Sequence, residues 1–401
     1  MKSMVLVADA FPPLRSSAAV QLQDLSLEFV RLGYQLTVVL PDAQLSTAWT
    51  VEDIQGVRVC RLSSPPTKDI GYIRRTINEF LSPFFMLYHY RRSPLALEKW
   101  DGVIWYSPSI FFGPFIRYLK SQSQCRSYLI LRDIFPQWAV DLGLMKKGLP
   151  YLFFKWIEGY QYRTADVIGV QSQANLPYFE KMPLSKNRRI EVLQNWLSSS
   201  ENNGCSIDLA STMLAGRKIF VYAGNMGVAQ GSLVFLDLAQ ALAHRQDVGI
   251  VLVGRGSDAL VLRQQARDRE LDNILFFDEI PSNEIPGLYA QCHIGMVVLD
   301  SRHKTHNVPG KFLSYLQSGL PVLAKLNSGN DLVKLILDER VGYATTSDST
   351  DQLRLLAEKL LEDLDEKGVF SYKSQCQNLM SRLFSPETAV KQIDSGLRAQ
   401  G

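Results

Sequence analysis

One tract just past the middle of the chain constrains the fold more than any other. It reads Phe220-Val-Tyr-Ala-Gly-Asn-Met-Gly-Val-Ala-Gln-Gly231, which predicts a buried strand, a glycine-rich turn and then a helix. A turn of this kind presents backbone N–H groups and a helix N-terminus to an anion such as a phosphate. The chain also opens with a predicted strand (Met4–Ala8), a loop (Asp9–Ala19) and a helix that runs to Leu32. Two such beginnings predict an α/β protein with two doubly wound domains that face each other across a cleft.

Short apolar runs recur in both halves of the chain and alternate with helical stretches. After the first loop, Leu22, Leu25 and Phe29 keep the spacing of three and four residues that places them on one buried helix face. Alternating strands and helices predict a mostly parallel sheet in each half. The remaining predicted strands are Leu36–Leu40, Val57–Arg61, Val103–Tyr106, Tyr128–Leu131, Val167–Val170, Ile190–Leu193, Lys218–Tyr222, Gly249–Val253, Ile274–Phe277, Ile294–Val298 and Pro321–Ala324.

A polar segment separates the two halves. Ser198–Ser206 has few apolar residues, and we interpret it as an interdomain linker. The length of 401 residues is enough for two or three domains, each with its own core. We therefore expect domains at residues 1–198 and 207–384, with a last helix at about residues 385–401 that crosses back to the first domain.

Composition restricts the class of protein further. Residues 1–200 contain 23 Lys and Arg against 16 Asp and Glu, whereas the remainder contains 20 against 24. The basic first half favours contact with an anionic surface or substrate, although a solvated face would explain it too. The five cysteines are scattered without a C-x-x-C pair, which favours a reducing compartment over a zinc site or a disulfide framework. We expect no signal peptide, because the apolar strand Met4–Ala8 that follows Lys2 is too short for one. We expect no membrane span, because no apolar run reaches about 18 residues.

In open α/β sheets, ligands bind beyond the carboxyl ends of the strands, so the residues that follow each strand are candidates. The loop Asp9–Ala19 has small residues that permit close approach of a ligand, or it is an ordinary loop between a strand and a helix. Asp133 follows the predicted strand Tyr128–Leu131 and suits acid–base or hydroxyl-orienting chemistry. Two structural roles stay open for Asp133, namely a helix N-cap and a salt bridge with Arg132.

The second half offers cations and amides for a diphosphate. Arg255 stands between two glycines at the end of a predicted strand, and Asp278–Ile280 end another, where backbone groups would read a nucleobase. A helix start at Pro309-Gly310 offers free N–H groups to an anion. Four basic side chains lie near that helix start in the sequence: His303, Lys304, His306 and Lys311.

One motif in the second half looks like a metal site, but we do not interpret it as one. Asp363-Leu-Asp365 resembles a metal-binding D-x-D, but it lies in a charged helical stretch with no strand before it. We therefore predict a solvated helix face there. No Ser or Cys nucleophile stands with a His and an Asp at predicted strand ends, so hydrolase chemistry has no support either.

One stretch of the first half concerns a different kind of partner. Ile70–Pro94 is apolar and aromatic and is bracketed by Arg74-Arg75 and Arg91-Arg92, and Lys146–Trp156 has the same character. Such segments are typical of a surface that dips into a membrane interface. The alternative is a pair of core helices with basic ends.

These motifs, in this order, resemble those of glycosyltransferase family 4. The likeness rests on the Gly-Asn-Met-Gly turn that begins at Gly224 and on Leu252–Gly256, Phe276–Pro281 and Gly310–Pro321. It covers nearly the whole chain, because three more segments fit the same family: Asp9–Pro13, Ala165–Ser172 and Gln194–Trp196. The bacterial branch that builds O-antigen or capsule, which includes N-acetyl-L-fucosamine transferases, is the most similar.

The resemblance implies a GT-B architecture of two Rossmann-like domains, with the acceptor on the first and the nucleotide-sugar on the second. It implies donor phosphates against Gly224, Asn225, Met226, Gly227, Arg255 and Lys311. The nucleoside would lie against Asp278, Glu279, Ile280 and Ser314, and the donor sugar against His306, Asn307, Val308, Pro309 and Gly310. The acceptor would meet Asp9, Arg15, Ser16 and Ser17, and we expect Asp133 and His306 to act in catalysis.

The chain departs from the family at several positions. Two family glutamates, eight positions apart, correspond here to His306 and Ser314. The Gly-Gly of the first loop is replaced by Ser16–Ala19. The arginine and lysine of the mid-chain loop correspond to Asn225 or Met226 and to Gln230. These departures are the reason to keep a non-catalytic protein among the alternatives.

We therefore expect a retaining glycosyltransferase of hexosyltransferase type that needs no metal or other cofactor. It would move a sugar from a nucleotide diphosphate-sugar to a lipid-diphosphate-linked saccharide in O-antigen or capsule synthesis. We expect it in the cytoplasm, peripheral on the inner face of the cytoplasmic membrane, with no nucleic-acid partner. Two alternatives stay open: a nucleotide-sugar epimerase of the same fold, and a non-catalytic subunit of a saccharide-assembly complex.

Overall fold

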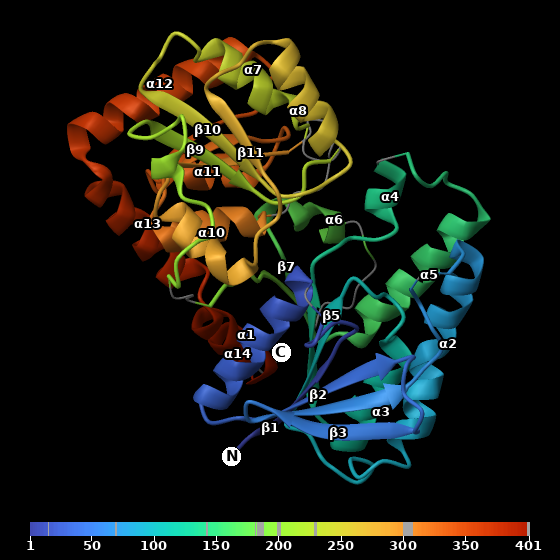
Figure 1. Ribbon diagram of the computed structural model, residues 1–401. Helices are drawn as coiled ribbons and strands as arrows, with labels where there is room; N and C mark the ends of the chain where they lie inside the picture. Colours follow the sequence, from blue (N-terminus) through green and yellow to red (C-terminus); the bar gives the residue numbers. More distant parts are fainter. Residues whose placement is uncertain are drawn as a thin grey trace. The chain divides into compact units, whose positions relative to one another are not determined.

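The computed structural model of the chain forms two compact units, each built around one sheet (Figure 1). The first unit comprises Met1–Trp196 and Pro386–Gly401, and the second comprises Leu197–Ser385. The structure describes residues 1–14, 16–68, 70–141, 143–180, 182, 188–198, 202–227, 231–299 and 308–398, without the side chains of residues 367 and 369. Both units have the Rossmann-like α/β architecture that the sequence predicts.

The first unit contains an eight-stranded sheet in the order β3-β4-β2-β1-β5-β6-β7-β8. Every neighbouring pair runs parallel except β3 and β4. The central strands are continuous apolar runs because helices cover both faces of the sheet. The strands are β1 (Ser3–Val7), β2 (Gln35–Asp42), β3 (Trp49–Ile54), β4 (Val57–Ser63), β5 (Gly102–Ser107), β6 (Arg126–Leu131), β7 (Val167–Val170) and β8 (Arg189–Val192).

The helices of the first unit bury opposite faces of this sheet. Leu22, Leu25 and Phe29 of α1 enter one core, as the predicted spacing requires, and Met86 and Phe115 enter the core on the other face. The helices are α1 (Ser17–Arg31), α2 (Tyr72–Tyr90), α3 (Gly113–Ser123), α4 (Gln137–Asp141), α5 (Leu149–Thr164), η1 (Gln173–Asn175), α6 (Pro177–Glu180) and α14 (Pro386–Arg398).

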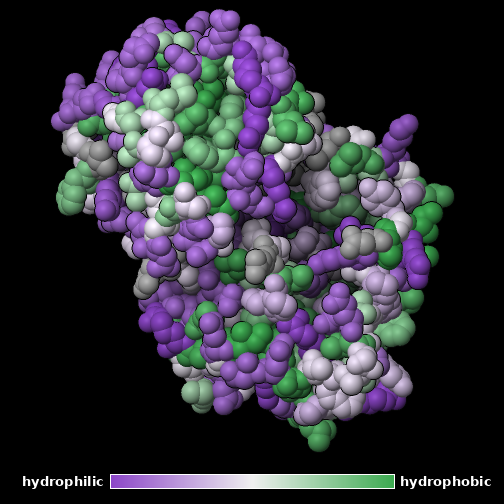
Figure 2. All heavy atoms as spheres, in the orientation of Figure 1, coloured by the Kyte–Doolittle hydropathy of each residue, from purple (hydrophilic) through white to green (hydrophobic). Residues whose placement is uncertain are grey.

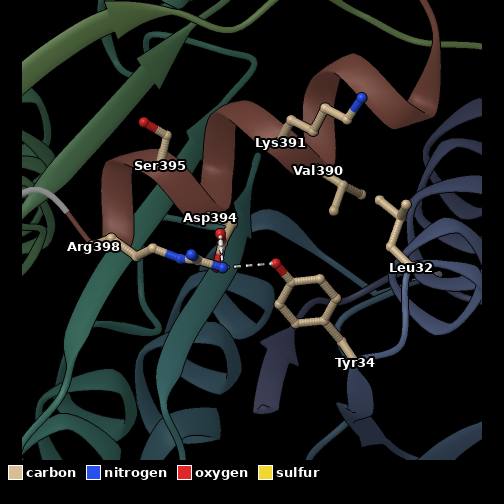
Figure 3. Close-up of a pocket in the computed structure, with 7 residues that line it drawn as sticks. All are labelled: Leu32, Tyr34, Val390, Lys391, Asp394, Ser395 and Arg398. Carbon is tan, nitrogen blue, oxygen red and sulfur yellow. Dashed lines mark hydrogen bonds and ion pairs between the residues drawn. The ribbon is translucent and has the colours of Figure 1, made fainter. Parts of the chain in front are cut away.

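The last helix, α14, packs on the first unit beside α1. Val390 and Ile393 enter the core that α1 also fills. A surface groove of about 580 Å³ remains between α14 and the end of α1 (Figure 3). Its charged groups are already satisfied: Asp394 pairs with Lys2 (3.2 Å) and with Arg398 (2.5 Å). The groove is therefore explained by the anchoring of the helix.

The second unit contains a six-stranded parallel sheet in the order β11-β10-β9-β12-β13-β14. Its strands are β9 (Lys218–Ala223), β10 (Val248–Val253), β11 (Ile274–Phe277), β12 (Ile294–Val298), β13 (Val322–Lys325) and β14 (Gly342–Thr345). Its helices are η2 (Leu209–Ser211), α7 (Leu233–Ala241), α8 (Ala259–Asp268), η4 (Ser282–Glu284), α9 (Ile285–Tyr289), α10 (Gly310–Ser318), α11 (Asp331–Asp338), α12 (Thr350–Lys367) and α13 (Val369–Leu383).

Two edge strands were not predicted, β3 and β14. β3 pairs with β4 through a two-residue turn in which Gln55 (φ 56°) and Gly56 (φ 85°) both have positive φ. Positive φ at both central residues is the geometry of a tight hairpin turn. The residues of β3 are half-buried or exposed because the strand lies at the sheet edge, and so the apolar run that marks a central strand is missing.

The expectation for Asp363 was wrong. Its carboxylate is buried and accepts hydrogen bonds from the hydroxyls of Tyr343 (2.7 Å) and Tyr372 (2.9 Å). Asp365, two residues on, is exposed and pairs with Lys218. In a helix these two positions point in different directions, so one aspartate joins α12 to β14 and α13 while the other lies at the surface.

We predict that Asp363→Ala lowers the free energy of unfolding of the second unit by about 2–3 kcal/mol, because it leaves two phenol hydroxyls without their acceptor. Urea unfolding followed by circular dichroism measures the change. Asp365→Ala is the matched control and should change the free energy by less than about 0.5 kcal/mol. Equal losses in both variants would contradict a buried acceptor role for Asp363.

Candidate active site

The loops that follow β9 and β10 pack against each other backbone to backbone. A Cβ on Gly254 would lie 2.1 Å from the Gly224 carbonyl oxygen, and a Cβ on Gly256 would lie 2.1 Å from the Met226 carbonyl oxygen. All three glycines also have a φ between 142° and 151°, which side chains disfavour. The glycines of both motifs are thus required by the contact between two loops at the carboxyl edge of one sheet.

This contact changes the role expected for two residues. The Gly224 N–H donates to the Val253 carbonyl (2.8 Å), and the Met226 N–H donates to the Arg255 carbonyl (2.8 Å). These amides continue the ladder between β9 and β10, so they are not offered to a phosphate. The Met226 side chain is buried in the core below. Gly224 and Met226 therefore shape the loop instead of donating to a ligand.

Lys311 lies directly above this loop. The residue follows Gly310 at the start of α10, and its stem crosses Gly224, where a Cβ would lie 2.4 Å from the Lys311 Cε. The ammonium is 4.9 Å from the centroid of the Tyr222 ring. Burial lowers the pKa of Lys311, because a desolvated ammonium is disfavoured. Within the described part of the chain, no carboxylate pairs with it.

Lys311 is therefore a half-buried cation without a counter-charge, at the N-terminus of a helix. A helix N-terminus carries a partial positive charge and unsatisfied N–H groups. Pro309 precedes the helix and provides no side-chain cap. Both features favour an anion at this position. Tyr222 stabilises the turn beneath, because its hydroxyl donates to the Asn225 carbonyl (2.7 Å).

The other residues predicted for the donor lie around the same sheet edge. Arg255 follows β10, is 81% exposed and pairs with Glu279 (3.0 Å). Asp278 follows β11 and pairs with Arg263 (2.6 Å). Ser314 is on the first turns of α10 and donates to the Gly310 carbonyl (3.2 Å). Val308 is buried. Six residues of the sequence analysis lie outside the described residues: Arg15, Gln230, His303, Lys304, His306 and Asn307.

At the carboxyl edge of the first unit's sheet, two carboxylates surround one tyrosine. Asp9 follows β1 and Asp133 follows β6, and desolvation raises the pKa of each above its usual value. The pKa of Tyr106, near the end of β5, rises to about 12, chiefly through burial and in part through the charges of Asp133 and Asp9. The topology β1-β5-β6 places these three strand ends side by side.

Arg132 does not form the salt bridge with Asp133 that the sequence left open. Its guanidinium donates to the Leu193 carbonyl (2.8 Å) and to the Gln194 carbonyl (3.3 Å), and lies 4.7 Å from the centroid of the Trp196 ring. Burial lowers the pKa of Arg132. Asp133 caps no helix in the described structure either, so neither of the structural roles that the sequence left open accounts for this residue.

Sequence reasoning missed two polar groups at this edge. The Ser107 hydroxyl at the end of β5 and the Nε of Arg132 are buried and lack a hydrogen-bond partner among the described residues. Such groups cost free energy unless a ligand or water satisfies them. The rule that strand ends carry ligand contacts would have found both. Of the predicted acceptor residues, Ser16 caps α1 by accepting from the Ala19 N–H (3.2 Å), and Ser17 begins that helix.

Helices α2 and α5 expose a continuous apolar surface, which we call the α2–α5 patch. The helices touch through Phe80 and Phe153, whose ring centroids are 6.0 Å apart. Hydrophobic side chains gather over these helices at the right-hand edge of Figure 2. Tyr72 is 88% exposed and Leu149 is 83% exposed. The patch comprises Tyr72, Ile73, Ile77, Leu81, Phe84, Phe85 and Tyr88 of α2 and Leu149, Leu152, Phe153 and Trp156 of α5.

Two kinds of feature are absent from the described residues. No group of three or more His, Cys, Asp or Glu side chains is arranged to hold a metal ion. Among the helices that the structure describes, none is both long enough and apolar enough to cross a bilayer.

Comparison with known proteins finds a family match within the second unit. Residues 210–375 match the family of glycosyl transferases group 1. The probable glycosyltransferase WbjE of Pseudomonas aeruginosa is 23% identical over 251 residues, which is 60% of this chain and 61% of that protein. The chain thus aligns with less than two thirds of the length of this relative.

Solved structures confirm the fold class. Anabaena HepE in complex with UDP and glucose superimposes with a TM-score of 0.67 and 16% identity, over 98% of this chain and 99% of that one. WaaG, a glycosyltransferase involved in lipopolysaccharide biosynthesis, superimposes with a TM-score of 0.63 and 12% identity, over 97% and 99%. At these identities the likeness shows the fold, which is the GT-B class of two Rossmann-like domains.

We predict that Asp133→Asn stabilises the first unit at neutral pH. A carboxyl whose pKa is raised in the folded protein binds its proton more tightly there than in the unfolded chain. Ionisation of the folded form therefore costs free energy at every pH above the raised pKa, and this cost disappears as the pH falls to the usual value of 3.8. Thermal unfolding should show a higher midpoint for the variant at pH 7.

The gain should shrink as the pH is lowered towards 4. Asp272→Asn, at an exposed position before β11, is the control and should leave the midpoint unchanged at both pH values. A midpoint for Asp133→Asn equal to or below that of the parent at pH 7 would show that the ionised carboxylate does not destabilise the fold.

Proposed function

We propose that this protein, whose residues 210–375 match the family of glycosyl transferases group 1, is a glycosyltransferase that uses a nucleotide diphosphate-sugar donor. The single observation that carries the proposal is the half-buried Lys311 ammonium, which lacks a counter-charge in the described structure and lies over the loops after β9 and β10. A diphosphate supplies the missing negative charge. HepE, which has the same fold, has been crystallised with UDP and glucose and with UDP-glucose.

The proposed reaction breaks the bond between the anomeric carbon of the donor sugar and the diphosphate oxygen. The acceptor hydroxyl oxygen forms the new bond to that carbon, its proton is released, and the nucleoside diphosphate leaves with the bonding electron pair. Negative charge therefore grows on the diphosphate. Lys311 and the α10 N-terminus stabilise that charge without reorganising, which is the largest contribution in many enzymes. Arg255 becomes available as a second cation when its ion pair with Glu279 breaks.

The nucleoside is assigned to the edge formed by Asp278, Glu279, Ile280 and Ser314, beside the diphosphate. The sugar is assigned to the segment that leads into α10, from His306 to Gly310. His306 and Asn307 belong to this proposal on the family resemblance alone. Retention of anomeric configuration, family 4 membership and the absence of a metal requirement rest on the same resemblance.

Asp133 and Asp9 are proposed to orient the acceptor hydroxyl. Each follows a strand of the first unit at the edge where ligands bind in this fold. The raised pKa values favour proton exchange closer to neutral pH than an ordinary aspartate permits. Ser107, whose hydroxyl has no partner in the described structure, adds a donor or acceptor at the same edge.

The acceptor is proposed to be a saccharide on a lipid diphosphate, in O-antigen or capsule synthesis, with N-acetyl-L-fucosamine as the first sugar to test. The likeness to WbjE, and to WaaG with its role in lipopolysaccharide biosynthesis, supports this choice. The α2–α5 patch supports it independently, because an enzyme that acts on a lipid needs a surface that enters the lipid interface. The patch holds seven exposed apolar or aromatic residues on α2 and four on α5.

Basic side chains border the α2–α5 patch, which favours the anionic cytoplasmic leaflet. Arg74 lies near the start of α2 and Arg92 follows its end, and Lys146 and Lys147 precede α5. Aromatic residues between cations suit the boundary between headgroups and acyl chains. We therefore place the protein on the inner face of the cytoplasmic membrane, held there peripherally.

We predict that Lys311→Ala weakens the binding of a nucleoside diphosphate by about 1.5–3 kcal/mol, roughly 10- to 150-fold in Kd, because a charge-assisted hydrogen bond is lost. The midpoint of thermal unfolding should stay the same or rise, since a desolvated charge is removed. Calorimetry with UDP, GDP and dTDP measures the affinity. Lys334→Ala, an exposed lysine on α11, is the control, and an affinity equal to the parent's for Lys311→Ala would refute the phosphate assignment.

We predict that the purified protein leaves a nucleotide-sugar unchanged by itself and transfers the sugar only when a lipid-diphosphate-linked saccharide is added. Mass spectrometry of both substrates over time follows the reaction. An isomerised nucleotide-sugar with no acceptor present would establish the epimerase instead. Failure of UDP, GDP and dTDP all to bind would favour the non-catalytic subunit.

We predict that the triple variant Ile73→Ser, Leu152→Ser and Trp156→Ser binds vesicles with anionic lipid at least tenfold more weakly, because burial of each side chain contributes roughly 1.5–3 kcal/mol at most. Vesicle flotation measures the bound fraction. The control removes three exposed apolar side chains of the second unit: Leu260→Ser, Leu355→Ser and Phe370→Ser. Equal flotation of the two triple variants would rule out docking through the α2–α5 patch.

A further inference from the structure

A second opening of the first unit lies at the opposite edge of its sheet from Asp9 and Asp133. It has a volume of about 620 Å³, which is in the range of small-molecule sites. Arg126 begins β6, and Asp133 follows the end of that strand. Six strand residues separate the two edges by roughly 16–20 Å. The opening therefore belongs neither to the proposed acceptor edge nor to the second unit.

Cations dominate the lining of this opening, which we call the basic pocket. Arg117 and Lys120 come from α3, Arg126 from β6 and Arg163 from the end of α5, against one carboxylate, Asp166. That carboxylate is already neutralised. Its oxygen lies 2.7 Å from the Lys120 Nζ, and it accepts from the backbone N–H and the hydroxyl of Ser127 (2.8 and 2.9 Å).

Three guanidinium groups then remain without a negative partner. Of the ion pairs that the described residues form, none includes Arg117, Arg126 or Arg163. The Nη1 atom of Arg126 is buried, and no described group accepts a hydrogen bond from it. A buried donor on a charged group destabilises the fold when it stays unsatisfied. The pocket thus has a surplus of positive charge, and one of the arginines that line it also has a buried donor without a partner.

The helix dipole explains only part of this arrangement. Cations are favoured at helix C-termini, and Lys120 serves this purpose because its Nζ donates to the Thr164 carbonyl (2.8 Å) at the end of α5. Arg126 is on a strand, and Arg117 is in the second turn of α3, so neither is placed at a helix C-terminus. A ligand explains both.

We propose that the basic pocket binds a compact ligand with two or more phosphate charges, at a site distinct from the donor and acceptor sites. Guanidinium groups present paired N–H donors that match phosphate oxygens. Three of them neutralise the charge of a diphosphate. Tyr160 is packed on Gly113, where a Cβ would lie 2.6 Å from its ring, and forms a fixed wall. The phosphate belongs to a free metabolite or to a lipid headgroup.

The test measures inorganic pyrophosphate binding by calorimetry in the Lys311→Ala variant, so that the donor site does not contribute. We expect one site in this background, and at least a tenfold loss of affinity when Arg117→Gln and Arg163→Gln are added. Both side chains are exposed, so the fold should persist, and circular dichroism checks it. Arg126→Gln alone should also weaken binding. Arg267→Gln with Lys334→Gln removes equal charge from the second unit and should have no effect.

A parallel arm uses vesicles of phosphatidylcholine with and without phosphatidic acid. Pyrophosphate binding that depends on the pocket arginines establishes a free phosphate ligand. Flotation with phosphatidic acid that depends on the same arginines, without pyrophosphate binding, establishes a lipid headgroup. If neither arm depends on Arg117, Arg126 or Arg163, the proposal is overturned. The proposed glycosyl transfer is unaffected by that result, because it rests on other residues.

Discussion

The second unit's candidate site depends on one constraint, the backbone contact between the loops after β9 and β10. Gly254 touches the Gly224 carbonyl so closely that no Cβ fits between them. In this contact the Gly224 and Met226 amides donate to backbone carbonyls, and the surface at Gly224 consists of backbone without a side chain. The Lys311 side chain packs over this backbone. Its ammonium lies near the Tyr222 ring, and the residue itself belongs to the first turn of α10. The surrounding protein removes water from the ammonium but supplies no carboxylate among the described residues. An anionic ligand is the counter-charge that this geometry calls for, and the glycines are what make room for it.

The two units treat charge in opposite ways, each at the carboxyl edge of its own sheet. In the second unit, desolvation disfavours the charged form of Lys311. In the first unit, desolvation disfavours the ionised forms of Asp9 and Asp133. Transfer of a glycosyl group needs both kinds of group: a cation where the diphosphate leaves and carboxylates near the hydroxyl that attacks. Charges that are held unpaired in this way weaken the fold slightly, and proteins retain them mainly at functional sites. The basic pocket gathers arginines that form no ion pair among the described residues, at an edge of the first sheet that the proposed transfer does not use.

Most of the fold was predictable because central parallel strands are apolar on both faces. Each predicted strand, from Met4–Ala8 to Pro321–Ala324, matches an observed strand within two residues at each end. The edge strand β3 was missed because its exposed positions interrupt the run of apolar residues by which a central strand is predicted. At the site, the sequence pointed to Lys311 and the glycines. It did not show that the Gly224 and Met226 amides are occupied, because a hydrogen bond between two loops depends on sheet order. For the same reason Arg132 reaches the end of β8, two strands away, instead of Asp133, and Asp363 finds two tyrosines from β14 and α13.

The most direct measurement of the central claim is the pKa of Lys311 itself, followed by NMR of the lysine side chain with and without a saturating nucleoside diphosphate. The account predicts a pKa below the ordinary value of 10.5 in the free protein, because the ammonium is desolvated and unpaired. It predicts a clear rise when UDP, GDP or dTDP binds, because the diphosphate supplies the counter-charge. An ordinary pKa in the free protein, or a value that is the same with and without a bound nucleotide, would contradict it.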